Sequence, residues 1–190
     1  MGTLSKVSIS ALVSALIVST IAATTLFSSA EPVDPPSMDL RPPSTVNYPG
    51  FLNLTEEVAE YRESRLVTLE KFVELADSDE AIILDTRSKA AFDAGHIKGA
   101  VHLNFSDFTE TSLAEVIGDK TRPILIYCNN NFADNAPPVM EKKAPLALNI
   151  PTFINLYGYG YKNIYELRDL ISMSAPADLW VTSATTDNQH

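Results

Sequence analysis

The sequence predicts an α/β fold in which helices cover both faces of a mainly parallel β-sheet. Two continuous apolar runs, residues 81–85 and 123–127, have the length and composition of strands that are buried on both faces. Segments with helical periodicity lie between these and other short apolar runs, so strands and helices alternate along the chain. With 45% hydrophobic and 20% charged residues, the composition is that of an ordinary globular domain.

Local signals place the individual elements. Thr68 is a good N-cap for a helix with one apolar face, and Gly95 and Gly118 each stand where a short helix would end. Pro151 suits the first turn of a later helix. These signals predict strands at residues 66–67, 81–85, 100–103, 123–127 and 163–167, and helices at residues 68–76, 88–94, 112–117 and 151–157.

The first thirty residues have the pattern of an export signal. Lys6 supplies a positive charge, residues 7–27 are largely apolar, and small residues lead up to Ala30. We therefore expect cleavage after Ala30 and a periplasmic or otherwise exported bacterial protein. The alternative is an uncleaved membrane anchor, because the apolar stretch is long enough to span a bilayer.

The remainder divides into a leader, one domain and a short tail. Residues 31–64 form a proline-rich linker and N-terminal extension, with six prolines before residue 50 and a helical patch at 54–62. Residues 65–181 are the predicted domain, and residues 182–190 are a polar tail. We expect this single domain to be a monomer.

Charge and cysteine content exclude several function classes. The formal net charge of −10 repels phosphate backbones, so nucleic acid is not an expected partner, and membrane contact is expected only through the signal segment. The single cysteine, Cys128, excludes an internal disulfide. His102 has no partner at the spacing of a metal site, and we expect neither a metal nor a cofactor.

Two predicted strands end in residues that carry chemistry. Asp85 and Arg87 lie at the end of the first buried strand, and Cys128 directly follows the second. Because ligands of parallel sheets bind beyond the carboxyl ends of the strands, we expect these residues at one site. The alternative for Cys128 is a buried, inert small hydrophobic residue, and for Asp85 and Arg87 it is a structural ion pair.

Between these strand ends lies the segment 91–104, which contains Phe92, Gly95-His96-Ile97 and Gly99-Ala100. With the flanking motifs and residues 158–167, it resembles the rhodanese family over about residues 66–170. The resemblance implies a three-layer rhodanese-like fold, Cys128 as the catalytic nucleophile, and Asp85, Arg87 and His96 as supporting residues.

The resemblance also implies sulfur transfer. In the family, a cysteine thiolate takes sulfane sulfur from a donor such as thiosulfate, holds it as a persulfide and passes it to a thiophilic acceptor. The expected partners are therefore a small sulfur-donor anion and such an acceptor. Backbone N–H groups and a helix N-terminus facing Cys128 would stabilise the anionic forms of the sulfur.

The loop after Cys128 departs from the family pattern, because residues 128–135 contain no Arg, Lys or Gly. Their side-chain amides could hold an anionic donor, or the loop could be a solvated turn. Asp134 is expected to raise the pKa of the thiol. The predicted substrate-binding residues are Asn129, Asn130, Asn131, Phe132 and Ala133.

A further departure is an insertion at residues 134–149. It could displace the helix that should point at Cys128, or Pro137-Pro138 could open a substitute helix. Lys142 and Lys143 lie in this segment and could return the missing positive charge. These departures leave alternatives to a sulfurtransferase: a catalytically silent rhodanese-like binding or regulatory module, or redox sensing by Cys128.

Overall fold

A computed structural model describes residues 45–78, 80–174 and 178–182. The chain divides into two units, Met1–Ser44 and Thr45–His190, and all described residues belong to the second. The predicted signal segment and most of the polar tail lie outside the described residues. Among the helices that are described, none is both long and apolar enough to cross a membrane.

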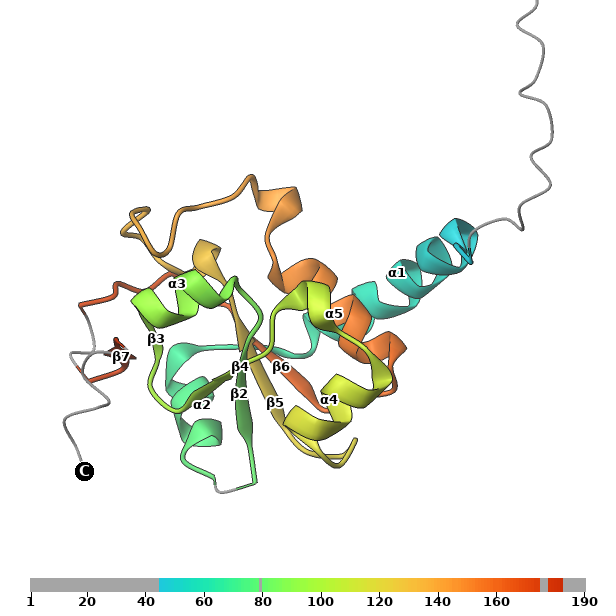
Figure 1. Cartoon of the computed structure of the whole chain (residues 1–190), viewed down its shortest axis with the longest axis horizontal. Coiled ribbons are helices and arrows are strands. Elements are labelled where there is room, and N and C mark those ends of the chain that lie inside the picture. The colour runs from blue at the N-terminus through green and yellow to red at the C-terminus, as the bar shows by residue number, and fades with distance from the viewer. Residues whose placement is uncertain (1–44, 79, 175–177, 183–190) are drawn as a thin grey trace, which may run out of the picture. The chain divides into compact units, whose positions relative to one another are not determined.

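The domain is built on a five-stranded parallel sheet with the order β1-β6-β5-β2-β4 (Figure 1). All five predicted strands are confirmed, and the residues of the two central ones are fully buried, as their continuous apolar sequences predict. The strands are β1 (Leu66–Val67), β2 (Ile82–Asp85), β4 (Ala100–His102), β5 (Ile124–Tyr127) and β6 (Ile164–Leu167).

Helices cover both faces of this sheet, as predicted. On one face, Leu84 and Ile126 pack with residues of α1 (Tyr48–Glu63), α4 (Glu110–Ile117) and α5 (Asn149–Gly158). On the other face, Ile83 and Leu125 pack with Phe72 of α2 (Leu69–Ala76). Alternate side chains of each strand point to opposite faces, so the sheet lies between two packed cores.

Capping side chains fix where the helices begin. The Thr68 hydroxyl accepts a hydrogen bond from the Lys71 amide at the start of α2, and Ser88 caps α3 (Lys89–Ala94) in the same way. Helix α1 begins at Tyr48, earlier than the sequence predicts, because Asn47 caps it and Pro49 is tolerated in a first turn.

The structure also contains a two-stranded sheet that the sequence did not predict. Strand β3 (His96–Ile97) pairs antiparallel with β7 (Trp180–Val181) near the end of the chain. Each strand has only two residues, too few for an alternating pattern to reveal it. The pairing brings the Trp180 ring against Gly95, where an added Cβ would lie 2.5 Å from the indole nitrogen.

Candidate active site

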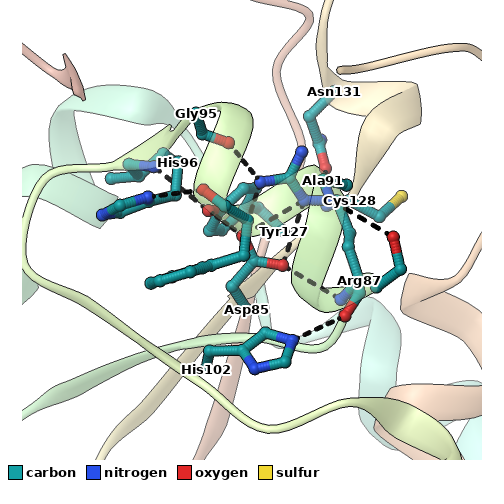
Figure 2. Close-up of polar contacts among 12 residues, drawn as sticks. Asp85, Arg87, Ala91, Gly95, His96, His102, Tyr127, Cys128 and Asn131 are labelled. Atoms are coloured by element: carbon teal, nitrogen blue, oxygen red, sulfur yellow. Dashed lines mark hydrogen bonds and ion pairs between the residues drawn. The ribbon is translucent and has the colours of Figure 1, made fainter. Parts of the chain in front are cut away.

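Neighbouring strands bring the predicted site residues together. Cys128 directly follows β5, and Asp85 ends β2, with Asp85 in register with Tyr127. Figure 2 shows the Arg87 guanidinium turned toward Asp85 and Gly95, while the sulfur of Cys128 lies on the other side of that group. The carboxyl edge of the sheet therefore carries both Cys128 and the buried ion pair of Asp85 and Arg87.

The sulfur of Cys128 is almost completely covered and faces backbone N–H groups. Burial, the largest effect, raises the pKa of the Cys128 thiol above its ordinary value of 9.0. Hydrogen bonds from the amides of Asn149, Asn130 and Leu148 act in the opposite direction. With the residue only 1% exposed, the resting site holds a neutral thiol at neutral pH.

The carboxylate that raises the thiol pKa is Glu166, not Asp134 as the sequence analysis expects. Glu166 lies in β6, is 4% exposed, and is held by Arg62 of α1 at 2.5 and 2.6 Å. Asp134 instead turns away to accept hydrogen bonds from the Met173 amide at 2.8 Å and the Ser172 hydroxyl.

Neither prediction for the insertion is correct. The inserted segment runs away from the cysteine loop and then back to it. Helix α5 therefore begins at Asn149, with the Leu148 and Asn149 amides facing Cys128. No helix begins at Pro137-Pro138, and the one helical turn in the segment is the 3-10 turn Ala144–Leu146. The helix N-terminus is thus preserved at the cysteine although the sequence leading to it is longer.

The three loop asparagines bind the chain itself rather than forming an open amide cradle. Asn129 donates to the Met140 carbonyl at 2.8 Å. Asn130 donates to the Lys142 carbonyl at 2.7 Å and accepts from the Lys142 amide at 3.1 Å. Each side-chain amide therefore spends a hydrogen bond on the chain itself, and Asn130 acts on Cys128 through its backbone amide.

Asn131 ties the loop to its surroundings. Its Oδ1 accepts from the Cys128 amide at 2.9 Å and from the Asn149 side chain at 3.1 Å. Its Nδ2 donates to the carbonyls of Leu167 at 2.7 Å and Asp169 at 3.2 Å. One buried side chain thereby fixes the cysteine, the start of α5 and the end of β6.

Phe132 and Ala133 do not line the cavity at Cys128 and are structural. The Phe132 ring packs edge-on against Tyr127 and Trp180, with ring centroids 6.0 and 4.9 Å away. Ala133 donates its amide to the Ile171 carbonyl at 2.8 Å. Their assignment as substrate-binding residues rested on proximity in sequence, and the chain turns inward after Asn131.

Asp85 and Arg87 form a buried ion pair at 2.6 Å, and each has further partners. Arg87 also donates to the Gly95 carbonyl at 2.7 Å, and Asp85 accepts from the Tyr127 hydroxyl at 2.5 Å. Tyr127, absent from the predicted site, is 1% exposed and closes this network by accepting from the Ile97 amide. The network braces the segment that follows β2.

The histidines near this brace are structural. The His96 ring stacks on Phe92 at 3.8 Å, and its Nδ1 contacts the Phe92 carbonyl at 2.8 Å. His102 Nε2 contacts the Arg87 carbonyl at 2.9 Å. Over the described ranges, no group of three His, Cys, Asp or Glu side chains could hold a metal ion.

Two cavities meet Cys128. The first, of about 320 Å³, opens between the ends of β2 and β5 and is lined by residues that include Thr86, Ser88, Asn104, Ser106, Cys128 and Lys142. The second, of about 300 Å³, lies on the side of β6 and α1 and includes Arg62, Glu166 and Arg168. Sequence reasoning missed Arg62 and Glu166, because no local pattern relates a residue of α1 to one of β6.

These features define a class: an α/β domain that presents a cysteine to backbone amides at the carboxyl edge of a parallel sheet. The family model of the rhodanese-like domain matches residues 68–169, more than half of the chain. The chain therefore belongs to the rhodanese-like domain family, and the fold is that of the family.

Several solved structures are similar to this chain at low sequence identity. The Rhodanese_3-like domain of the Alr3790 protein from Anabaena sp. is 20% identical, with 54% of this chain and 92% of that chain covered and a TM-score of 0.38. The BH2092 protein from Bacillus halodurans is 17% identical, with 61% and 74% covered and a TM-score of 0.36. Wild-type EanB is 20% identical, with 59% and 25% covered and a TM-score of 0.40. No curated protein matches the sequence significantly.

Proposed function

We propose that this protein is a sulfurtransferase or persulfide carrier that uses Cys128. The observation that carries the proposal is the set of three backbone amides, from Asn130, Leu148 and Asn149, around a sulfur at the end of a cavity. Such amides stabilise an anionic thiolate and an anionic persulfide alike. Membership of the rhodanese-like family supports the same chemistry.

The proposed first step loads one sulfur atom. The Cys128 thiol gives its proton to solvent, and the thiolate attacks the outer sulfur of thiosulfate. The new Sγ–S bond forms as the S–S bond of the donor breaks, and sulfite leaves with the electron pair. In the second step a thiophilic acceptor such as cyanide attacks the outer sulfur, and the Cys128 thiolate is regenerated. No external oxidant or reductant is needed.

We further propose that the reaction takes place outside the cytoplasm of a bacterium. The support is the pattern of residues 1–30, with a cationic start, an apolar stretch and a small-residue cleavage site at Ala30.

Turnover tests this proposal. Thiocyanate should form from thiosulfate and cyanide with the wild-type protein, and Cys128→Ser should reduce the rate to background, because serine is a far weaker nucleophile toward sulfur. Cys128→Ala is the matched control, because it shows whether the serine hydroxyl of Cys128→Ser causes any remaining thiocyanate formation. Equal thiocyanate formation by wild type and Cys128→Ser would rule out catalysis at this residue.

The burial of Cys128 favours a second candidate function, a catalytically silent rhodanese-like binding module. A cysteine that is 1% exposed and whose thiol pKa is raised is a poorer nucleophile than an open thiolate. If the protein is a binding module, the wild type should load no sulfur from any donor. Cys128→Ser should then change neither the fold nor the binding of partners.

A further inference from the structure

The cavity at Cys128 has an unusual charge for this protein. The whole chain carries a formal net charge of −10. Within the described part of the chain, however, the charged residues that line this cavity are Arg87 and Lys142, and no carboxylate lines it. A positive cavity on an acidic molecule attracts small anions against the general field of the protein.

The two cations are not equivalent. The Arg87 guanidinium is 3% exposed and is committed to Asp85 and to the Gly95 carbonyl. Lys142 is exposed, and across residues 45–78, 80–174 and 178–182 no ion pair involves it. Lys142 therefore has the positive charge that remains available to a ligand.

The main chain of Lys142 is held in place relative to the cysteine loop. Asn130, two residues after Cys128, binds both the amide and the carbonyl of Lys142. Asn129 donates one hydrogen bond to the Met140 carbonyl, so the insertion is attached to the loop at two points. These bonds hold the main chain of Lys142 at the cavity and leave its side chain free to move.

We propose that Lys142 is a specificity-determining residue whose ammonium group selects small anions over neutral molecules for approach to Cys128. The biological meaning of this selection rests on the proposed function, because thiosulfate is such an anion. The selection itself is a property of the cavity and can be measured without sulfur transfer.

Two alkylating reagents of nearly equal size test the proposal in the full-length protein. Iodoacetate is an anion and iodoacetamide is neutral, and each loses iodide when the Cys128 thiolate attacks its carbon. Lys142→Gln should lower the ratio of the iodoacetate rate to the iodoacetamide rate by roughly two- to fivefold at low salt, as expected for one exposed charge. The ratio cancels any change in the thiol pKa, and added salt should reduce the effect.

Lys143→Gln is the matched control, because it removes the same charge from the next residue, which does not line this cavity. The proposal predicts an unchanged ratio for that variant. An equal fall in both variants, no fall in Lys142→Gln, or a Cys128 that neither reagent can reach would each overturn it.

Thiosulfate separates this inference from the proposed function. If sulfur loads onto Cys128 with equal rates in wild type and Lys142→Gln, the inference fails while the proposed function stands. If no sulfur loads but the alkylation ratio responds to Lys142→Gln alone, the proposed function fails and the anion-selective cavity stands.

Discussion

At the scale of single residues, Cys128 is subject to two opposing effects. Burial and the Glu166 carboxylate favour the neutral thiol, while three backbone amides favour the thiolate. Because burial is the larger effect, the thiol pKa lies above 9.0 and only a small fraction of the protein is reactive at neutral pH. The reaction of Cys128 with any electrophile should therefore accelerate as pH rises toward that pKa.

Replacing Glu166 by Gln should lower the pKa of the Cys128 thiol, because the variant removes a nearby negative charge and keeps the side-chain shape. The thiolate absorbance, followed through an alkaline titration against Cys128→Ser, measures the change directly. Glu115→Gln is a control, since it removes the same charge from a residue that is not among the groups shifting this thiol. A thiol pKa that stays the same or rises in Glu166→Gln would contradict this assignment.

At the scale of elements, α1 joins the site to the N-terminal extension. Arg62 of α1 is bonded through two nitrogens to the buried Glu166 of β6, and Tyr61 of the same helix donates to the Lys162 carbonyl at 2.6 Å. Helix α1 lies outside the matched family segment, which begins at residue 68. The N-terminal extension therefore supplies Glu166 with a charge partner from outside the matched segment.

Arg62→Met should lower the free energy of unfolding by about 3 kcal/mol, because it leaves the Glu166 carboxylate buried without its partner. The double variant Arg62→Met/Glu166→Met should cost clearly less than the sum of the two single variants. Urea unfolding of the four proteins measures this coupling. Additive costs would mean that the pair does not stabilise the docking of α1.

The loop after Cys128 makes a second prediction at this scale. Asn131→Ala should lower the free energy of unfolding by about 2 kcal/mol, because it leaves buried backbone groups of Cys128 and Leu167 without a partner. Asn130→Ala, at a more exposed position, should cost less and should mainly speed hydrogen exchange at the Lys142 amide. Equal costs for the two variants, measured by urea unfolding, would contradict this division of roles.

At the scale of the whole molecule, the sequence was sufficient to predict the parallel strands and the meeting of Asp85 and Cys128 at their carboxyl ends, but not the charged groups around the cysteine. The strands at residues 81–85 and 123–127 follow from continuous apolar runs, and the cap at Thr68 follows from residue type. The contacts that decide the chemistry join residues far apart in sequence. Glu166 lies beside Cys128 only because β6 pairs with β5, and no local pattern predicts such a charge.

The raised pKa values also make the whole fold sensitive to alkali. In the unfolded chain Cys128 and Tyr127 ionise near their ordinary values of 9.0 and 10.0, whereas in the fold each does so only at higher pH. Stability from these groups is therefore fully present below the unfolded pKa and is lost as pH rises through the folded pKa. Urea unfolding should show a decline beginning near pH 9, delayed in Cys128→Ser. A stability that rises through this range would contradict the prediction.

Intact-mass spectrometry of the protein after incubation with thiosulfate tests the central claim most directly. The account predicts that the wild-type chain gains the mass of one sulfur atom, that cyanide removes it, and that Cys128→Ser gains nothing. A wild-type mass that stays unchanged with thiosulfate, polysulfide and mercaptopyruvate would contradict the account and leave a rhodanese-like fold without sulfur chemistry.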